Sequence, residues 1–176
     1  VNAPDRMQLD FDNEYIKDSF SHEDFTLSLA GVLRYSSNTG MTNFASQIDR
    51  ETRHDYLQKF GFGAVSSLMF EGESSGILHP ASEWDEMTNL VTTFGQGISV
   101  TSLQMAYAYQ AIANGGLRLD PLLVESCLDE DGTVAYKPTQ QATRVVSTAS
   151  ANLDLELMEK VVEFGGVGKT AAIPGY

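Results

Sequence analysis

The sequence predicts a mainly α-helical chain that contains one small β-hairpin. Three observations lead to this fold class. A capping box opens an apolar run at residues 101–113, and apolar residues recur at helical spacing over 150–164. The hairpin is predicted because two short apolar segments flank the turn Asp129-Glu130-Asp131-Gly132.

Composition supports a packed protein and excludes one class of partner. The 176 residues suit one domain or part of one, and a hydrophobic content of 42% argues against disorder. The net charge is −13, and residues 60–117 contain no Lys or Arg. Because phosphate binding needs clustered basic side chains, nucleic acid is excluded as a partner. No apolar run approaches the roughly 18 residues that a membrane span requires.

The first half of the chain predicts three helices. Residues 1–34 are polar and acidic, but the apolar residues at 25, 29, 32 and 33 predict a short helix, followed by a loop over 35–40. Residues 41–48 predict a second helix. Asp49 is the predicted N-cap of a third helix over 50–59, and residues 64–84 predict a long ordered loop.

The second half predicts two further helices around the hairpin. The run 103–113 is apolar almost all round, so we expect this helix to be buried on all sides at the centre of its lobe. Cys127, the one cysteine, is expected in a hairpin strand as a small buried residue. The helix over 150–164 needs a large apolar cover. Without one, we expect the isolated chain to be marginally stable, to aggregate or to be completed by another chain.

Several tempting motifs favour an ordinary structural role. Gly168-Lys169-Thr170 is no phosphate-binding loop, because Glu163 occupies the position that needs glycine. The histidines lack the spacing of a metal site, and the acidic group near residue 85 is typical of a solvated turn. The sequence therefore predicts no metal and no cofactor. These residues are His22, His54, His79, Glu83, Asp85 and Glu86.

One tripeptide carries potential chemistry. Ser36-Ser37-Asn38 places a hydroxyl and a carboxamide side by side after an apolar helix. A hydroxyl can relay a proton, and an amide can both donate to and accept from a peptide-like substrate. Taken alone, the tripeptide favours a helix cap.

The surrounding sequence changes that interpretation. The segment 33–41, which contains the tripeptide, resembles the second active-site motif, Ser-x-Asn, of penicillin-binding protein transpeptidases. Together with the later matches, the resemblance covers nearly everything from residue 27 to 176, in the family's order, and is strongest to the monofunctional class B enzymes of division or elongation type. The later matching segments are 60–63, 76–80 with Trp84, 95–106, 108–116 and 171–176.

Two motifs of the family do not occur in these 176 residues. Ser-x-x-Lys is absent, and Lys169-Thr170-Ala171 does not replace Lys-Thr-Gly. We expect the first motif before Val1 and the second after Tyr176. The resemblance therefore implies that residues 1–176 are a single partial domain, catalytically inert alone. It implies the helical lobe of the α/β serine β-lactamase/transpeptidase-like fold, lacking most of the central sheet.

The resemblance also implies roles for individual residues. In this family an upstream serine attacks the D-Ala–D-Ala bond of a stem peptide, and an amine from a second strand resolves the acyl-enzyme. Carried over by position, Ser36 would be catalytic, shuttling a proton between the activating lysine and the leaving amine. Asn38 would be catalytic and substrate-binding, through a hydrogen bond to the amide of the substrate or β-lactam. For Ser37 we prefer simple capping.

Two functions remain open. The parent is a peptidoglycan D,D-transpeptidase that binds penicillin, or a non-catalytic relative that acts as a β-lactam sensor or cell-wall scaffold. Retention of Ser36 and Asn38 favours the enzyme, although a sensor would retain them too. The expected partners are peptidoglycan stem peptides, β-lactams and proteins of cell-wall synthesis or division. The expected location is outside the cytoplasm, with the parent anchored to the bacterial cytoplasmic membrane by a segment outside this chain.

Overall fold

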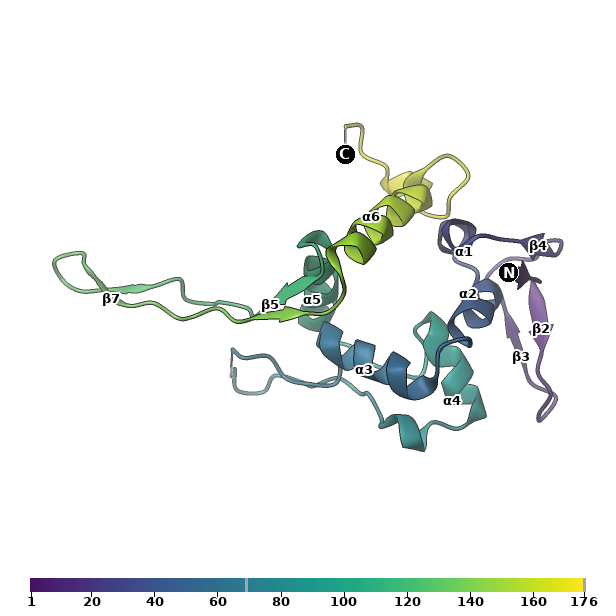
Figure 1. Cartoon of the computed structure of the whole chain (residues 1–176), viewed down its shortest axis with the longest axis horizontal. Helices are drawn as coiled ribbons and strands as arrows, with labels where there is room; N and C mark the ends of the chain where they lie inside the picture. The colour runs from purple at the N-terminus through teal and green to yellow at the C-terminus, as the bar shows by residue number, and fades with distance from the viewer. Residues whose placement is uncertain (69, 176) are drawn as a thin grey trace. The chain divides into compact units, whose positions relative to one another are not determined.

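The computed structural model describes residues 1–68 and 70–175, so Tyr176, the last residue of the matching segment 171–176, lies outside the described residues. Helices α1 to α6 dominate, as predicted, and the strands β1 to β8 are all short (Figure 1). The strands form four two-stranded antiparallel sheets in the described part, of which the predicted hairpin is one. The chain divides into two compact units, one made of Val1–His54, His79–Ile98 and Leu153–Tyr176, the other of Asp55–Leu78 and Ser99–Asn152.

The first unit begins with two strand pairs that the sequence did not predict. Strand β1 (Asn2–Ala3) pairs with β4 (Phe25–Thr26), and β2 (Arg6–Gln8) pairs with β3 (Tyr15–Lys17). The helix predicted from residue 25 therefore begins later, as α1 (Leu29–Tyr35). Its start is set by Ser28, whose hydroxyl accepts a hydrogen bond from the backbone N–H of Gly31 at 3.3 Å.

The helices that follow are closely spaced. The predicted loop over 35–40 is wrong, because α2 (Asn38–Ala45) begins after only two linking residues. Helix α3 (Arg50–Phe60) is confirmed, with the Asp49 carboxylate accepting from the backbone N–H of Thr52 at 2.7 Å. A 3-10 turn η1 (Ala81–Glu83), helix α4 (Glu86–Val91) and a second 3-10 turn η2 (Thr92–Phe94) complete this part.

Arg53 and a small core hold the first unit together. The guanidinium of Arg53 donates to the carbonyl of Asn89 at 2.9 Å and to the Thr92 hydroxyl at 3.1 Å, which fastens α3 to α4 and η2. The indole N–H of Trp84 donates to the carbonyl of His79 at 3.0 Å. The buried apolar side chains of the unit are Ala3, Ile16, Val32, Ala81 and Trp84.

The second unit is built on α5 (Ser102–Ala113). The predicted capping box is present, with the Thr101 hydroxyl and the Gln104 side chain each bonded to the other residue's backbone N–H. After α5, strand β5 (Leu117–Leu119) pairs with β8 (Ala142–Arg144). Between them, β6 (Cys127–Leu128) and β7 (Val134–Tyr136) form the predicted hairpin, with Gly132 at φ 84° in its turn.

Two burial predictions in this unit are wrong. Met105 and Tyr109 of α5 are 41% and 55% exposed, so the helix is not buried on all sides in this chain. Cys127 is exposed rather than buried: among the described residues β6 pairs with β7 alone, and every residue of these two strands is exposed.

Helix α6 (Thr148–Val162) is confirmed, and a 3-10 turn η3 (Lys169–Ala171) follows it. Leu153 is 55% exposed, which agrees with the expected lack of a full apolar cover. Among the helices of the described residues, none has the length and apolar character needed to cross a membrane.

Candidate active site

The link between α1 and α2 is a tight turn that the backbone closes by itself. The backbone N–H of Ser36 donates to the carbonyl of Leu33 at 3.1 Å, and that of Ser37 donates to the carbonyl of Val32 at 3.0 Å. These bonds satisfy carbonyls that the end of α1 would otherwise leave unpaired. These two bonds fix the backbone of the turn, and α2 begins directly after Ser37.

Ser36 occupies an unusual position in this turn. Its backbone is left-handed, with φ 52° and ψ 45°, a region that costs a non-glycine residue about 1–2 kcal/mol. Its side chain is exposed. Residues held in such a conformation cluster at functional sites, where the surrounding structure fixes them. The turn thus leaves Ser36 exposed to solvent at the expense of backbone strain.

Ser37 has the opposite environment. It is 2% exposed, and its hydroxyl accepts a hydrogen bond from the backbone N–H of Gly40 at 3.0 Å as the N-cap of α2. Gly40 is required here, since a Cβ atom at that position would lie 2.8 Å from the side chain of Val32. The interpretation of Ser37 as a helix cap is confirmed.

Asn38, the first residue of α2, is held by the β3 strand. Its side-chain nitrogen donates to the carbonyl of Lys17 at 2.9 Å. The next residue, Thr39, is anchored too: its hydroxyl donates to the carbonyl of Pro4 at 2.6 Å, and its backbone N–H donates to the carboxylate of Asp18 at 3.0 Å. The start of α2 is therefore fixed by residues of the N-terminal strand pairs.

Ser36 and Asn38 line one cavity of about 300 Å³. Thr93 and Phe94 of η2 also line this cavity. The hydroxyl of Thr93 donates to the carbonyl of Leu90 at 2.6 Å and lies 3.1 Å from the hydroxyl of Thr42. The structure thus brings the two sequence-predicted site residues to one hollow, and a contact of Thr93 with Thr42 ties the η2 residues that line it to α2.

Asn38 also borders a second hollow, of about 590 Å³. This one includes Phe94, Gln96 and Gly97, so it reaches the start of the matching segment 95–106. Gly95 and Gly97 have φ values of 88° and 73°, which an L side chain adopts only with strain. Glycine at these two positions therefore lets the backbone of this segment turn without strain.

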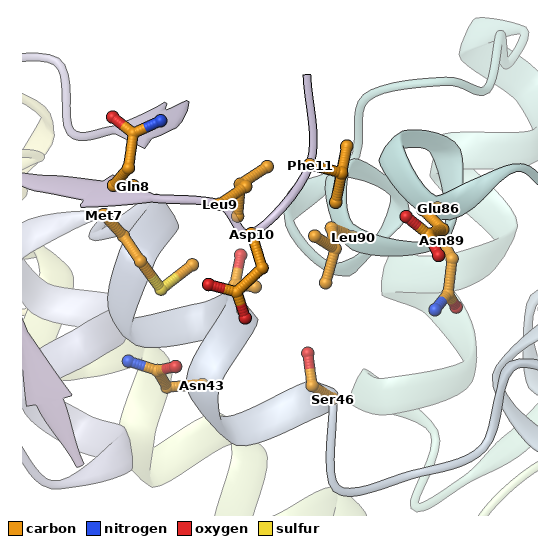
Figure 2. Close-up of a pocket in the computed structure, with 11 residues that line it drawn as sticks. Met7, Gln8, Leu9, Asp10, Phe11, Asn43, Ser46, Glu86, Asn89 and Leu90 are labelled. Carbon is orange, nitrogen blue, oxygen red and sulfur yellow. The ribbon is translucent and has the colours of Figure 1, made fainter. Parts of the chain in front are cut away.

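A third cavity, of about 580 Å³, was not foreseen from the sequence (Figure 2). It lies between residues 7–11, which are the end of β2 and the segment after it, the C-terminal part of α2 and helix α4. Figure 2 shows Asn43 from α2, Ser46 directly after that helix, and Leu90 and Glu86 from α4 around it. Neither Ser36 nor Asn38 lines it, so it is separate from the hollow of the predicted site.

The remaining candidates from the sequence have structural roles or lie on the surface. Asp85 caps α4 by accepting from the backbone N–H of Thr88 at 2.6 Å, and His54 packs against the ring of Trp84. His79 lies 3.6 Å from the exposed Glu83. Within residues 1–68 and 70–175, no group of three or more His, Cys, Asp or Glu side chains could hold a metal ion.

Sequence reasoning missed the residues that support the turn. Lys17, Asp18, Thr93 and Phe94 come from segments far from Ser36 along the chain. The sequence held one local hint of this support: Asp18 and His22 are four positions apart. In the structure, Oδ2 of Asp18 lies 3.0 Å from Nε2 of His22. That pair is ordinary in sequence, and only the fold places it against α2.

Comparison with known proteins gives a consistent result. A family model described as penicillin binding protein transpeptidase domain matches residues 6–176. Penicillin-binding protein PbpB of Mycobacterium tuberculosis is 34% identical over 167 residues, covering 92% of this chain and 25% of that protein. Peptidoglycan D,D-transpeptidase FtsI of Escherichia coli is 31% identical over 161 residues, with coverage of 92% and 25%.

Solved structures agree. Penicillin binding protein 3 from Mycobacterium tuberculosis, in its ampicillin complex, superposes with a TM-score of 0.91 at 32% identity, over 100% of this chain and 40% of that one. The transpeptidase domain of penicillin-binding protein 3 from Burkholderia pseudomallei gives a TM-score of 0.81 at 27% identity, with coverage of 100% and 50%. The chain thus spans about a quarter of the curated relatives named above.

Proposed function

This chain belongs to the penicillin-binding protein transpeptidase family, and on that premise we propose that it is part of a class B peptidoglycan D,D-transpeptidase that cross-links stem peptides and is acylated by penicillin. One family model spans both compact units, which supports the proposal that residues 1–176 are the middle of a single transpeptidase domain. We place the segment in the helical lobe of that domain, with most of the central sheet supplied by other parts of the protein.

The observation that carries this function is the shared cavity of Ser36 and Asn38. The exposed Ser36 and the anchored Asn38 line one hollow, while the intervening Ser37 is buried as a cap. Acyl transfer to and from a peptide needs a proton relay near the nucleophile and a group that aligns the substrate amide. Ser36 and Asn38 supply these two functions in the proposed reaction.

The reaction transfers one acyl group in two steps, first to a serine of the enzyme and then to an amine. A serine of the intact protein attacks the D-Ala–D-Ala carbonyl, the terminal D-Ala leaves as an amine, and a second stem-peptide amine then displaces the serine. The activating lysine takes the proton of the attacking serine, and Ser36 relays it from the lysine to the departing amine. Asn38 accepts from or donates to the amide of the bound peptide or β-lactam. The segment alone lacks the nucleophile and is inert.

The cellular setting belongs to the same proposal. FtsI of Escherichia coli is named as a peptidoglycan D,D-transpeptidase, and the mycobacterial relative of known structure was solved with ampicillin. By analogy, the partners of this protein are stem peptides, β-lactams and proteins of cell-wall synthesis or division. Its transpeptidase domain lies outside the cytoplasm, and the intact protein is anchored to the cytoplasmic membrane.

Two measurements test the proposal. The coding DNA on either side of this segment should encode Ser-x-x-Lys upstream and Lys-Thr-Gly downstream. The purified intact protein should form a covalent adduct with fluorescent penicillin and release D-Ala from a stem peptide. If one motif is missing and D-Ala is not released, the enzymatic proposal fails and a non-catalytic penicillin-binding sensor or scaffold replaces it.

A further inference from the structure

A buried carboxylate next to the candidate site has no part in the proposed acyl transfer. Asp18 directly follows β3, and its side chain is 1% exposed. A charge so well shielded from water requires partners that satisfy it. Asp18 has two: the backbone N–H of Thr39, 3.0 Å from Oδ1, and the imidazole of His22, 3.0 Å from Oδ2.

The first partner connects Asp18 to the candidate site. Thr39 is the second residue of α2 and is fully buried. Its N–H is one of the donors that the start of a helix leaves unpaired, and a carboxylate at this end also interacts favourably with the helix dipole. The residue before Asp18, Lys17, accepts from the side chain of Asn38. Two consecutive residues thus hold the backbone and the side chain at the start of α2.

The second partner holds the carboxylate in place. Both ring nitrogens of His22 face oxygen atoms: Nδ1 lies 2.7 Å from the carbonyl of Glu23, and Nε2 lies 3.0 Å from Asp18. A neutral imidazole has only one N–H to donate, whereas the protonated ring has two. The imidazolium form therefore satisfies both oxygens. The ring is also stacked on Phe25, with centroids 4.3 Å apart.

From these contacts we propose that Asp18, held by His22, is a positioning residue for acyl transfer: it fixes the start of α2 and thereby the placement of Ser36 and Asn38. This inference rests on the proposed transpeptidase function. Without the carboxylate, the buried N–H of Thr39 loses its acceptor, and the first turn of α2 must move to find another. Misplacement of a catalytic group by about 1 Å can slow a reaction roughly 100-fold.

The test uses the intact protein and separates positioning from stability. The noncovalent dissociation constant and the acylation rate constant for fluorescent penicillin are measured for wild type, Asp18→Ala and Asp18→Asn. Asp18→Ala should lower the acylation rate constant by roughly 10- to 100-fold. Asp18→Asn keeps an oxygen that can accept from Thr39, so it should restore the rate to within about threefold of wild type.

Two controls make the result specific. Asp5→Ala removes another carboxylate near His22, which accepts a hydrogen bond from Ser21 and, among the described residues, has none to α2. This variant should leave the acylation rate constant unchanged. Thr101→Ala removes the cap of α5 in the other unit and lowers stability without touching the turn. If acylation falls equally in Thr101→Ala and Asp18→Ala, the effect of Asp18 is only structural and the inference is overturned.

Every other outcome is also decisive. Wild-type rates in a folded Asp18→Ala protein, or no rescue by Asp18→Asn, overturn the inference. If Asp18→Ala does not fold, His22→Gln takes its place and should slow acylation by about two- to tenfold, whereas an unchanged rate contradicts the positioning role. Failure of the wild-type protein to be acylated at all counts against the proposed function and is recognised before any variant is compared.

Discussion

The side-chain nitrogen of Asn38 donates a hydrogen bond to the backbone carbonyl of Lys17, 2.9 Å away. This bond assigns the orientation of the carboxamide, because only its nitrogen can donate to a carbonyl. The Oδ1 atom is then the part of Asn38 that remains to accept a hydrogen bond from a ligand N–H. A residue that appeared in the sequence only as a motif member thus has a defined donor side and a defined acceptor side.

The two serines of the turn should differ sharply when each is replaced. Ser37→Ala removes the N-cap of α2 and should lower the free energy of unfolding of the intact protein by about 0.5–2 kcal/mol. Chemical denaturation measures this loss. Ser28→Ala, which removes the cap of α1, is a matched control and should cost a similar amount. No loss of stability in Ser37→Ala would contradict the capping role.

Replacing Ser36 by glycine should stabilise the folded protein. Its φ of 52° strains any residue with a Cβ atom, so Ser36→Gly should raise the free energy of unfolding by about 1 kcal/mol. Ser36→Ala keeps the Cβ atom and should show no such gain. Thermal melts of the two variants distinguish them, and a destabilised Ser36→Gly protein would show that the backbone of this turn is unstrained.

The buried side chain of Gln104 makes three hydrogen bonds in the second unit. Its nitrogen donates to the carbonyls of Ala64 and Ser75 at 2.9 and 2.8 Å, and its oxygen accepts from the N–H of Thr101 at 2.9 Å. Gln104→Met keeps a side chain of similar volume but removes these bonds. The free energy of unfolding should therefore fall by roughly 2–4 kcal/mol. Ser102→Ala, at an exposed position on the same helix, should change stability by less than about 0.5 kcal/mol.

Stability should depend on pH through His22. Desolvation alone would lower the pKa of His22, but the hydrogen bonds to Glu23 and Asp18 and the negative charges of Asp18 and Asp5 outweigh it and raise the pKa above 6.5. A raised folded-state pKa contributes stability that is complete below pH 6.5 and is lost as the pH rises through the folded-state value.

The check is the difference in unfolding free energy between wild type and His22→Gln, measured by denaturation at several pH values. The difference should be largest in mild acid and should shrink as the solution becomes alkaline. A difference that grows with pH would show that the neutral ring is the form that the fold prefers.

Local signals in the sequence predicted the elements that depend on few distant contacts. Thr101 and Gln104 specify the start of α5, Asp49 specifies α3, and Gly132 specifies the turn of the hairpin. Each of these signals acts through a hydrogen bond or a backbone angle within a few residues. Such features can be recognised before any tertiary structure is known.

Other features depend on contacts between distant segments. Strands β1 and β4 are two residues each and pair across more than 20 positions, so no alternation of side chains reveals them. Tyr109 was expected to be buried because an apolar helix usually is, but burial depends on which neighbours exist. The assignment of Ser36 and Asn38 came from resemblance to a family, and their shared cavity required the fold.

The central claim is that the Ser36 hydroxyl takes part in acyl transfer, and the most direct measurement compares Ser36→Ala with Ser37→Ala in the intact protein. The acylation rate constant for fluorescent penicillin should fall by about 10²–10⁴ in Ser36→Ala, the usual worth of a proton-transfer group. It should stay near the wild-type value in Ser37→Ala at temperatures where that variant is folded. Equal rates in wild type and Ser36→Ala would contradict the account.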